Sequence, residues 1–150
     1  MTSRKTSTRG NDFQPPLLGA LLRFTWQKLR GSLLEALHEA GFTDLNPAHI
    51  NVFQYPSPEG SRPIDLAARA SMSRQAMNYL LSELEAMGYL TRDRLGQGTS
   101  AKVTLTEKGR QVGVVLRRHV KRIETEWARA LGQKRFDDLL SSLKEMSGLP

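Results

Sequence analysis

Apolar residues recur every three or four positions through much of this chain, and that spacing predicts amphipathic helices. The first predicted helix covers residues 17–40. A short helix should then begin at Asn46 and Pro47, which suit the N-cap and the first helical position, and it should turn Ile50 and Phe53 toward the core. The side chains of the first helix that we expect to lie inside are Leu17, Leu18, Leu21, Leu22, Leu29, Leu33 and Leu37.

Two more helices are predicted toward the C-terminus. One covers about residues 107–130, with Thr106 as its N-cap and Gly132 as the residue that breaks it. Its apolar stripe consists of Val112, Leu116, Val120, Ile123, Trp127 and Leu131. A last helix follows, and its apolar face consists of Phe136, Leu139, Leu140, Leu143 and Met146.

Residues 63–88 carry the pattern of two short helices joined by a tight turn. Pro63 suits the first turn of the first helix, where a missing N–H costs nothing, and Ser73 suits the N-cap of the second. The pattern predicts a helix-turn-helix whose second helix is the recognition helix. Its inward side chains are expected to be Leu66, Ala67, Ala70, Met77, Leu80, Leu81 and Leu84.

Alternating apolar and polar residues after Gly88 predict a β-hairpin. Its strands are expected over residues 89–94 and 101–105, with a glycine-containing tip at 95–100. The sequence therefore predicts a mainly α fold with a small β-hairpin wing. A winged helix-turn-helix at 46–106 is flanked by N- and C-terminal helices at 17–45 and 107–147.

The outer helices carry more apolar surface than a compact helix-turn-helix and hairpin can cover. Burial of apolar surface yields about 25 cal/mol per Å², so pairing of these helices between two copies is favourable, and we expect a homodimer. A twofold pair also suits duplex DNA, because recognition helices about 34 Å apart meet successive turns of the major groove. The alternative is that the outer helices pack into a bundle within one chain.

The charge of the chain favours a polyanionic partner. The net charge is +7 and the isoelectric point is near 10.1, although ribosomal or membrane-surface proteins share such a balance. All charged residues in 31–60 are acidic. The basic excess therefore lies on the N-terminal arm, the helix-turn-helix region and the last helices.

Several classes of protein are excluded or disfavoured by the sequence. The chain contains no cysteine, which excludes disulfides, thiolate sensors and cysteine-ligated metals. The longest apolar run, residues 17–22, is too short to span a membrane, and no stretch resembles a signal peptide. We therefore expect a cytoplasmic protein with no membrane partner.

Residues 1–16 lack apolar periodicity and predict a disordered basic tail, whereas residues 17–150 predict a single domain. The tail carries Arg4, Lys5 and Arg9. It is either an inert terminus or a basic arm that touches DNA.

The recognition helix carries the side chains that suit base readout. Gln75 and Asn78 can pair bidentately with adenine and Arg74 with guanine, each with about 1–3 kcal/mol of discrimination. Ser73 is a cap that can also donate to phosphate. The alternative is that this face is simply solvated. Other basic residues expected to touch the DNA backbone or minor groove are Arg62, Arg92, Arg94 and Lys102.

The ordered motifs of the chain resemble those of the multiple antibiotic resistance regulator (MarR) family of bacterial winged helix-turn-helix repressors. The resemblance covers about residues 17–147. It is carried by four segments, Leu45-Asn46-Pro47-Ala48, Asp65-Leu66-Ala67, Leu84-Glu85-Ala86-Met87-Gly88-Tyr89-Leu90 and Val103-Thr104-Leu105-Thr106-Glu107-Lys108-Gly109.

The resemblance implies a homodimeric repressor that binds a pseudo-palindromic operator, with the recognition helix in the major groove and the wing at the minor groove or backbone. It places the recognition-helix contacts on Ser73, Arg74, Gln75, Ala76, Asn78 and Tyr79. One departure concerns the wing, where the family usually has a charged Asp-x-Arg group. Here those positions fall around Gln97, Gly98 and Thr99, which are uncharged.

The resemblance also implies a small aromatic or phenolic effector bound between the outer helices and the DNA-binding unit. The residues expected to line that junction are Phe24, Trp26, Phe53, Tyr55, Arg118 and His119. The alternative is that these aromatic residues are ordinary core residues.

An enzyme, a cofactor and a metal site are not expected. The three histidines are far apart in sequence, no glycine-rich phosphate loop follows a strand, and no set of His, Asp and Glu has ligand spacing. The remaining rival is a winged-helix module that docks a protein and reads no DNA sequence.

Overall fold

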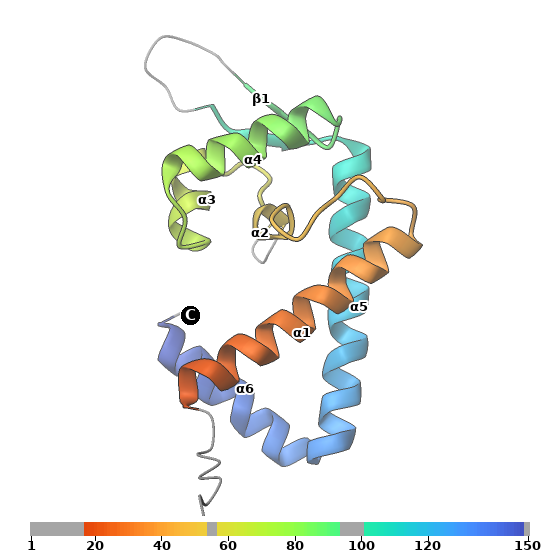
Figure 1. Ribbon diagram of the computed structural model, residues 1–150, viewed down its shortest axis with the longest axis vertical. Coiled ribbons are helices and arrows are strands. Elements are labelled where there is room, and N and C mark those ends of the chain that lie inside the picture. The colour runs from red at the N-terminus through yellow and green to blue at the C-terminus, as the bar shows by residue number, and fades with distance from the viewer. Residues whose placement is uncertain (1–16, 54–56, 94–100, 149–150) are drawn as a thin grey trace, which may run out of the picture.

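The computed structural model describes residues 17–53, 57–93 and 101–148, and it confirms a mainly helical fold with one small hairpin (Figure 1). The predicted tail, the hairpin tip, Tyr55 and Arg94 lie outside the described residues. The elements are α1 (Leu18–Glu39), α2 (Ile50–Phe53), α3 (Pro63–Arg69), α4 (Arg74–Ala86), β1 (Leu90–Arg92), β2 (Val103–Leu105), α5 (Glu107–Leu131) and α6 (Gln133–Ser147).

Helix α5 connects the two ends of the molecule (Figure 1). The helix-turn-helix of α3 and α4 and the hairpin of β1 and β2 lie at its N-terminal end, where α5 contacts β2. Helix α1 packs across α5, and α6 folds back from its other end. In the sequence, α2 lies between α1 and the helix-turn-helix. In space, α2 packs against the recognition helix α4.

The hairpin is short, and a third segment extends it. The strands pair antiparallel with Leu90 opposite Leu105. On the other edge of β2, the Gly60 amide donates to the Val103 carbonyl over 2.7 Å and the Val103 amide donates to the Ser61 carbonyl over 2.9 Å. These hydrogen bonds fix residues 60–61, which directly precede α3, to strand β2. They connect the start of the helix-turn-helix to the hairpin that follows it.

Tyr89 is the buried centre of the junction between the winged unit and α5. Its hydroxyl donates to the carboxylate of Asp44, which lowers the pKa of that carboxyl, and Lys108 Nζ lies 4.0 Å over its ring. The rings of Phe42 and Phe53 pack on it at centroid distances of 6.1 and 6.3 Å. These contacts connect the α1–α2 loop, the end of α4 and the start of α5.

The first turn of α5 packs directly against backbone. A Cβ added at Gly109 would lie 2.0 Å from the carbonyl oxygen of Tyr89, so only glycine allows this approach. The Thr106 hydroxyl accepts the Gly109 amide over 3.2 Å, which confirms the predicted N-cap, and it donates to the carbonyls of Gly88 and Tyr89. The Thr-Glu-Lys-Gly segment is thus a packing motif between α5 and the hairpin.

The helices and strands predicted from the sequence are present, although the strands are shorter than predicted. The burial of the first helix differs clearly from the prediction. The inward packing predicted for Leu17, Leu18, Leu21 and Leu22 is wrong for a single chain, where Leu18 is 68% and Leu22 is 49% exposed. The first turns of α1 therefore keep about half or more of each of these apolar side chains exposed. On α6, Leu139, Leu143 and Met146 are exposed as well, although Phe136 is buried. None of the described helices combines the length and apolar character needed to cross a membrane.

Candidate nucleic-acid interface

The recognition helix is rigidly placed by its buried side. The turn before it uses Ser71 in a left-handed conformation with φ of 52°, and Ser73 caps the helix by accepting the Ala76 amide over 3.0 Å. The apolar stripe predicted for this helix is confirmed, because Met77, Leu80, Leu81 and Leu84 are all buried. Four buried side chains over two turns fix the rotation of α4 about its axis.

The opposite side of α4 forms the recognition ridge, which we define as Ser73, Arg74, Gln75, Ala76, Asn78 and Tyr79. All are exposed except Ala76, which is half-buried, and Tyr79 is 65% exposed. The ridge presents hydroxyl, guanidinium and amide groups to solvent, which are the groups that pair with base edges and phosphates. The structure brings these six predicted residues together, and their contacts to DNA remain a prediction.

Arg62, the residue before α3, is already paired with a carboxylate of the first turn of that helix. Its Nε and Nη2 donate to the two carboxylate oxygens of Asp65 over 2.8 and 3.0 Å. This pairing raises the pKa of the Arg62 guanidinium and lowers that of Asp65. Both side chains remain exposed, so the pair contributes little to stability and Arg62 would have to share its charge with Asp65 to contact a phosphate.

Arg69 is a basic residue of this surface that sequence reasoning missed. It lies at the end of α3, is exposed, and donates to Ser61 Oγ over 3.3 Å. Arg62 and Arg69 are seven positions apart, a spacing that places both on the same side of the helix. That spacing was the signal that could have found it.

Arg92 ties the hairpin to the recognition helix. Only 12% of its side chain is exposed, and its Nη2 lies 2.8 Å from Glu85 Oε2 and 3.0 Å from Ser82 Oγ. Its backbone amide donates to the other oxygen of Glu85 over 3.0 Å. The guanidinium therefore lies between β1 and α4, and the predicted contact to DNA is untested. Lys102 is exposed on the hairpin, and Arg94 lies outside the described residues.

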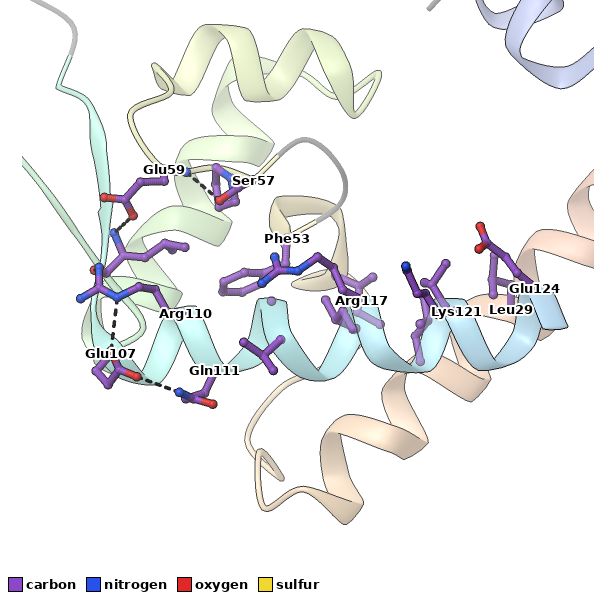
Figure 2. A pocket seen from close by; sticks show the side chains of 18 of the residues that line it. Leu29, Phe53, Ser57, Glu59, Glu107, Arg110, Gln111, Arg117, Lys121 and Glu124 are labelled. Atoms are coloured by element: carbon purple, nitrogen blue, oxygen red, sulfur yellow. Dashed lines mark hydrogen bonds and ion pairs between the residues drawn. The ribbon is translucent and has the colours of Figure 1, made fainter. Parts of the chain in front are cut away.

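A cavity of about 930 Å³ lies between the outer helices and the winged unit (Figure 2). Its apolar wall includes Trp26, Leu29, Leu33, Ile50, Phe53 and Leu116. Its basic lining residues, Arg110, Arg117 and Lys121, all come from α5 (Figure 2). Arg110 is paired with Glu107, whereas Arg117 and Lys121 form no ion pair with any residue of the described ranges.

The residues predicted for the effector junction are only partly in this cavity. Trp26 and Phe53 line it, and Tyr55 lies outside the described residues. Phe24, Arg118 and His119 are not part of the lining of this cavity, and their place at an effector site stays a prediction. Phe24 is exposed, and the Arg23 guanidinium lies 5.2 Å from its ring centre.

His119 has a packing role between α5 and α1. It is buried, its Nε2 lies 2.7 Å from Ser32 Oγ, and burial lowers the pKa of its imidazole. Arg118 is on the exposed side of α5. Neighbouring helix positions point about 100° apart, so Arg117 faces the cavity while Arg118 does not. In the part of the chain that the structure describes, no three His, Asp or Glu side chains are grouped so that they could hold a metal ion.

Comparisons with known proteins place this geometry in a family. No protein-family model matches the sequence, and no curated protein does. Among solved structures, the repressor CouR bound to a 23-mer DNA duplex is 25% identical, covers 87% of this chain and 92% of its own, and has a TM-score of 0.69. A MarR regulator from Methanosarcina mazei Go1 shares the fold with a TM-score of 0.72 at 14% identity, covering 87% of each chain.

A third structure carries the family assignment. It is a MarR family protein of Mycobacterium tuberculosis in complex with salicylic acid, which is 30% identical to this chain, with a TM-score of 0.57. The alignment covers 87% of this chain and 98% of that protein. Together with the winged helix-turn-helix and the outer helices described above, this similarity shows that the chain belongs to the MarR family of transcriptional regulators.

Proposed function

We propose that this regulator is a homodimeric repressor that reads a pseudo-palindromic operator with the recognition ridge of α4. The observation that carries the proposal is the ridge itself, in which exposed polar side chains lie on a helix whose other side is fully buried. Such a helix can enter the major groove without any rearrangement of its own core. Arg74 would pair with guanine, and Gln75 and Asn78 with adenine.

The homodimer is proposed from the apolar side chains that one chain leaves uncovered. They lie on the N-terminal half of α1 and along α6, on the side of the molecule away from α4 (Figure 1). A stable interface buries about 800 Å² on each partner, and a second copy is the partner that supplies a matching apolar surface. In this arrangement 17–45 and 107–147 contribute the dimer helices, and 46–106 form the DNA-binding unit.

The cavity is the proposed effector site, and an anionic aromatic compound fits its lining. Trp26 and Phe53 offer aromatic contact, and Arg117 and Lys121 offer positive charge, since neither forms an ion pair with a described residue. Glu59, Glu107 and Glu124 also line the cavity, so an anionic group would have to bind on the Arg117 side of the lining. The Mycobacterium tuberculosis relative was solved in complex with salicylic acid, which has this chemistry. Occupancy of a cavity between the dimer helices and the winged unit would shift their relative position and release DNA.

The test is a binding titration with the DNA upstream of the protein's own gene. Labelled fragments of that region and a shuffled fragment of equal composition are titrated at two salt concentrations. We expect the natural fragment to bind at least about 10³-fold more tightly than the shuffled one. Equal affinity for both fragments would contradict sequence-specific regulation, and no binding to either would favour a winged-helix module that docks a protein.

A further inference from the structure

The edge of β2 that faces away from β1 is closed partly by a side chain. The backbone of Gly60 and Ser61 pairs with Val103 on that edge. The next amide of the strand that points to the same edge belongs to Leu105, two positions further on. That amide donates to the carboxylate Oε2 of Glu59 over 2.6 Å. The Glu59 carboxylate therefore takes the place that a further backbone acceptor would have in this ladder.

Glu59 meets the strand within the lining of the cavity. Glu59 and Leu105 both line it, and Figure 2 shows the Glu59 carboxylate at the end of the cavity next to the hairpin. Arg110, which also lines the cavity, donates from Nη1 to the Leu105 carbonyl over 2.9 Å. The amide and the carbonyl of Leu105 are thus both bound by side chains of the lining. Among the described residues of β1 and β2, Leu105 alone borders the cavity, so an occupant would reach the hairpin there.

The two partners of the hydrogen bond differ in their access to water. Leu105 is 6% exposed, so an amide that lost this acceptor would be left unsatisfied unless the strand moved. Glu59 is an exposed residue, so its carboxylate can be hydrated when it turns away from the cavity. Loss of this hydrogen bond therefore affects β2 more than it affects Glu59.

We propose that Glu59 is the positioning residue through which an anion in the cavity acts on the hairpin. This role rests on the proposed effector site. In the DNA-binding state the carboxylate lies at the cavity and holds the Leu105 amide. A bound anion disfavours a second negative charge in the same cavity, so it favours the state in which Glu59 has turned to solvent and β2 is released. A ligand shifts a conformational equilibrium only through its different affinities for the two states, and this repulsion supplies the difference.

The other two acids of the lining have no such contact with the hairpin. Glu107, on the first turn of α5, accepts hydrogen bonds from Arg110 and Gln111. Glu124 lies at the opposite end of the cavity, near the far end of α5 (Figure 2). Within the described ranges, neither carboxylate bonds to a residue of β1 or β2. Glu124 therefore offers the matched control, because it has the same charge in the same cavity without the contact to the strand.

The experiment measures a coupling factor, which is the affinity for the natural upstream fragment without salicylate divided by the affinity with saturating salicylate. Factors of about 5 to 150 are typical of coupled sites. Glu59→Gln keeps an oxygen that can accept the Leu105 amide but removes the charge, and we expect it to lower the coupling factor at least about threefold. Glu59→Ala removes the acceptor as well, so it should also lower the operator affinity itself, by about 3- to 10-fold.

Glu124→Gln separates the contact with the strand from the charge of the cavity. Both Gln variants remove one carboxylate from the lining, so both should bind salicylate more tightly than the unchanged protein. Only Glu59→Gln should lower the coupling factor. An equal decrease in both variants would show that cavity charge alone sets the coupling, and it would overturn the role of Glu59.

Amide hydrogen exchange at Leu105 reports on the hydrogen bond directly. In the unchanged protein this amide should be protected, and saturating salicylate should speed its exchange at least about tenfold. In Glu59→Ala the exchange should be fast already without salicylate. A residue that only stabilised the fold would not make this exchange depend on salicylate.

The outcomes separate this role from the effector site on which it rests. A coupling factor in Glu59→Gln within about twofold of that of the unchanged protein, or a Leu105 amide that salicylate leaves equally protected, would overturn the role of Glu59 and leave the effector site standing. An unchanged protein whose operator affinity does not respond to salicylate would overturn both. If Glu59→Ala does not fold, Glu59→Gln and the exchange of the Leu105 amide in the unchanged protein give the answer.

Discussion

The winged helix-turn-helix and the opposite end of the molecule differ in how completely one chain covers its own apolar side chains. In α4 every residue of the apolar stripe is buried, and Tyr89 closes the junction to α5. On the first turns of α1 and along α6, leucines of the same periodicity remain exposed. The comparison teaches that the winged unit covers its own apolar side chains within one chain, whereas the helical end leaves apolar surface that the proposed homodimer would cover.

The largest expected effect comes from adding charge to the uncovered end. Leu22→Glu on α1 should convert the dimer to a monomer, because an unpaired charge would be buried in the interface. The affinity for a two-half-site operator should then fall about 10²- to 10⁴-fold, since the two recognition helices no longer bind as one unit. Sedimentation gives the mass and a titration gives the affinity.

The matched control on the same helix is Gln27→Glu, which adds the same charge at an exposed polar position. It should leave both the mass and the operator affinity unchanged. A monomeric unchanged protein, or equal behaviour of the two variants, would contradict the homodimer.

In the winged helix-turn-helix, truncation of a buried side chain should lower the stability of each chain by itself. Leu81 is fully buried in α4, and Leu81→Ala should lower the free energy of unfolding by about 2–5 kcal/mol. Chemical denaturation of a monomeric Leu22→Glu background measures this change without a contribution from dimerisation. A decrease below about 1 kcal/mol there would mean that the winged unit depends on the partner for its packing, and the contrast between the two ends would fail.

Local features of both ends could be predicted from the sequence, because they depend on neighbours in the chain. The caps at Ser73 and Thr106 and the apolar stripe of α4 follow from spacing and residue type. What covers an apolar stripe does not follow from its period. This is why Leu17 to Leu22 were predicted to lie inside a fold that leaves them exposed.

The candidate site was predictable only where one helix carries it. The apolar stripe of α4 predicts which side of the helix is exposed, and Arg74, Gln75, Ala76, Asn78 and Tyr79 follow from that pattern. Their assignment to DNA contact, together with Ser73, comes from the resemblance to the MarR family. The partner of Arg92 depends on the angle between β1 and α4, and the cavity depends on the rotation of α5. The prediction placed Arg118 in the lining, whereas the structure places Arg117 there, one position earlier on α5.

Substitutions in the cavity between the two ends should have a smaller effect, which is confined to effector binding. Arg117→Ala should weaken salicylate binding about tenfold, because it removes a charged hydrogen-bond donor from the lining. Arg118→Ala on the exposed side of α5 should change it by less than about twofold. Calorimetric titration measures both, and equal decreases, or an unchanged protein that does not bind salicylate, would contradict the assignment of this cavity.

The smallest effect distinguishes two roles for basic residues of the hairpin. Lys102 is exposed, so Lys102→Ala should flatten the dependence of log affinity on log salt by about 0.9 for each phosphate that the lysine neutralises. Arg92 is largely buried against Glu85 and Ser82, so Arg92→Ala should lower affinity for all sequences alike and leave that slope unchanged. It should also lower the free energy of unfolding by about 1–2 kcal/mol. A slope that falls by the same amount in both variants would show that Arg92 contacts phosphate, and it would contradict the role of Arg92 in holding the hairpin to α4.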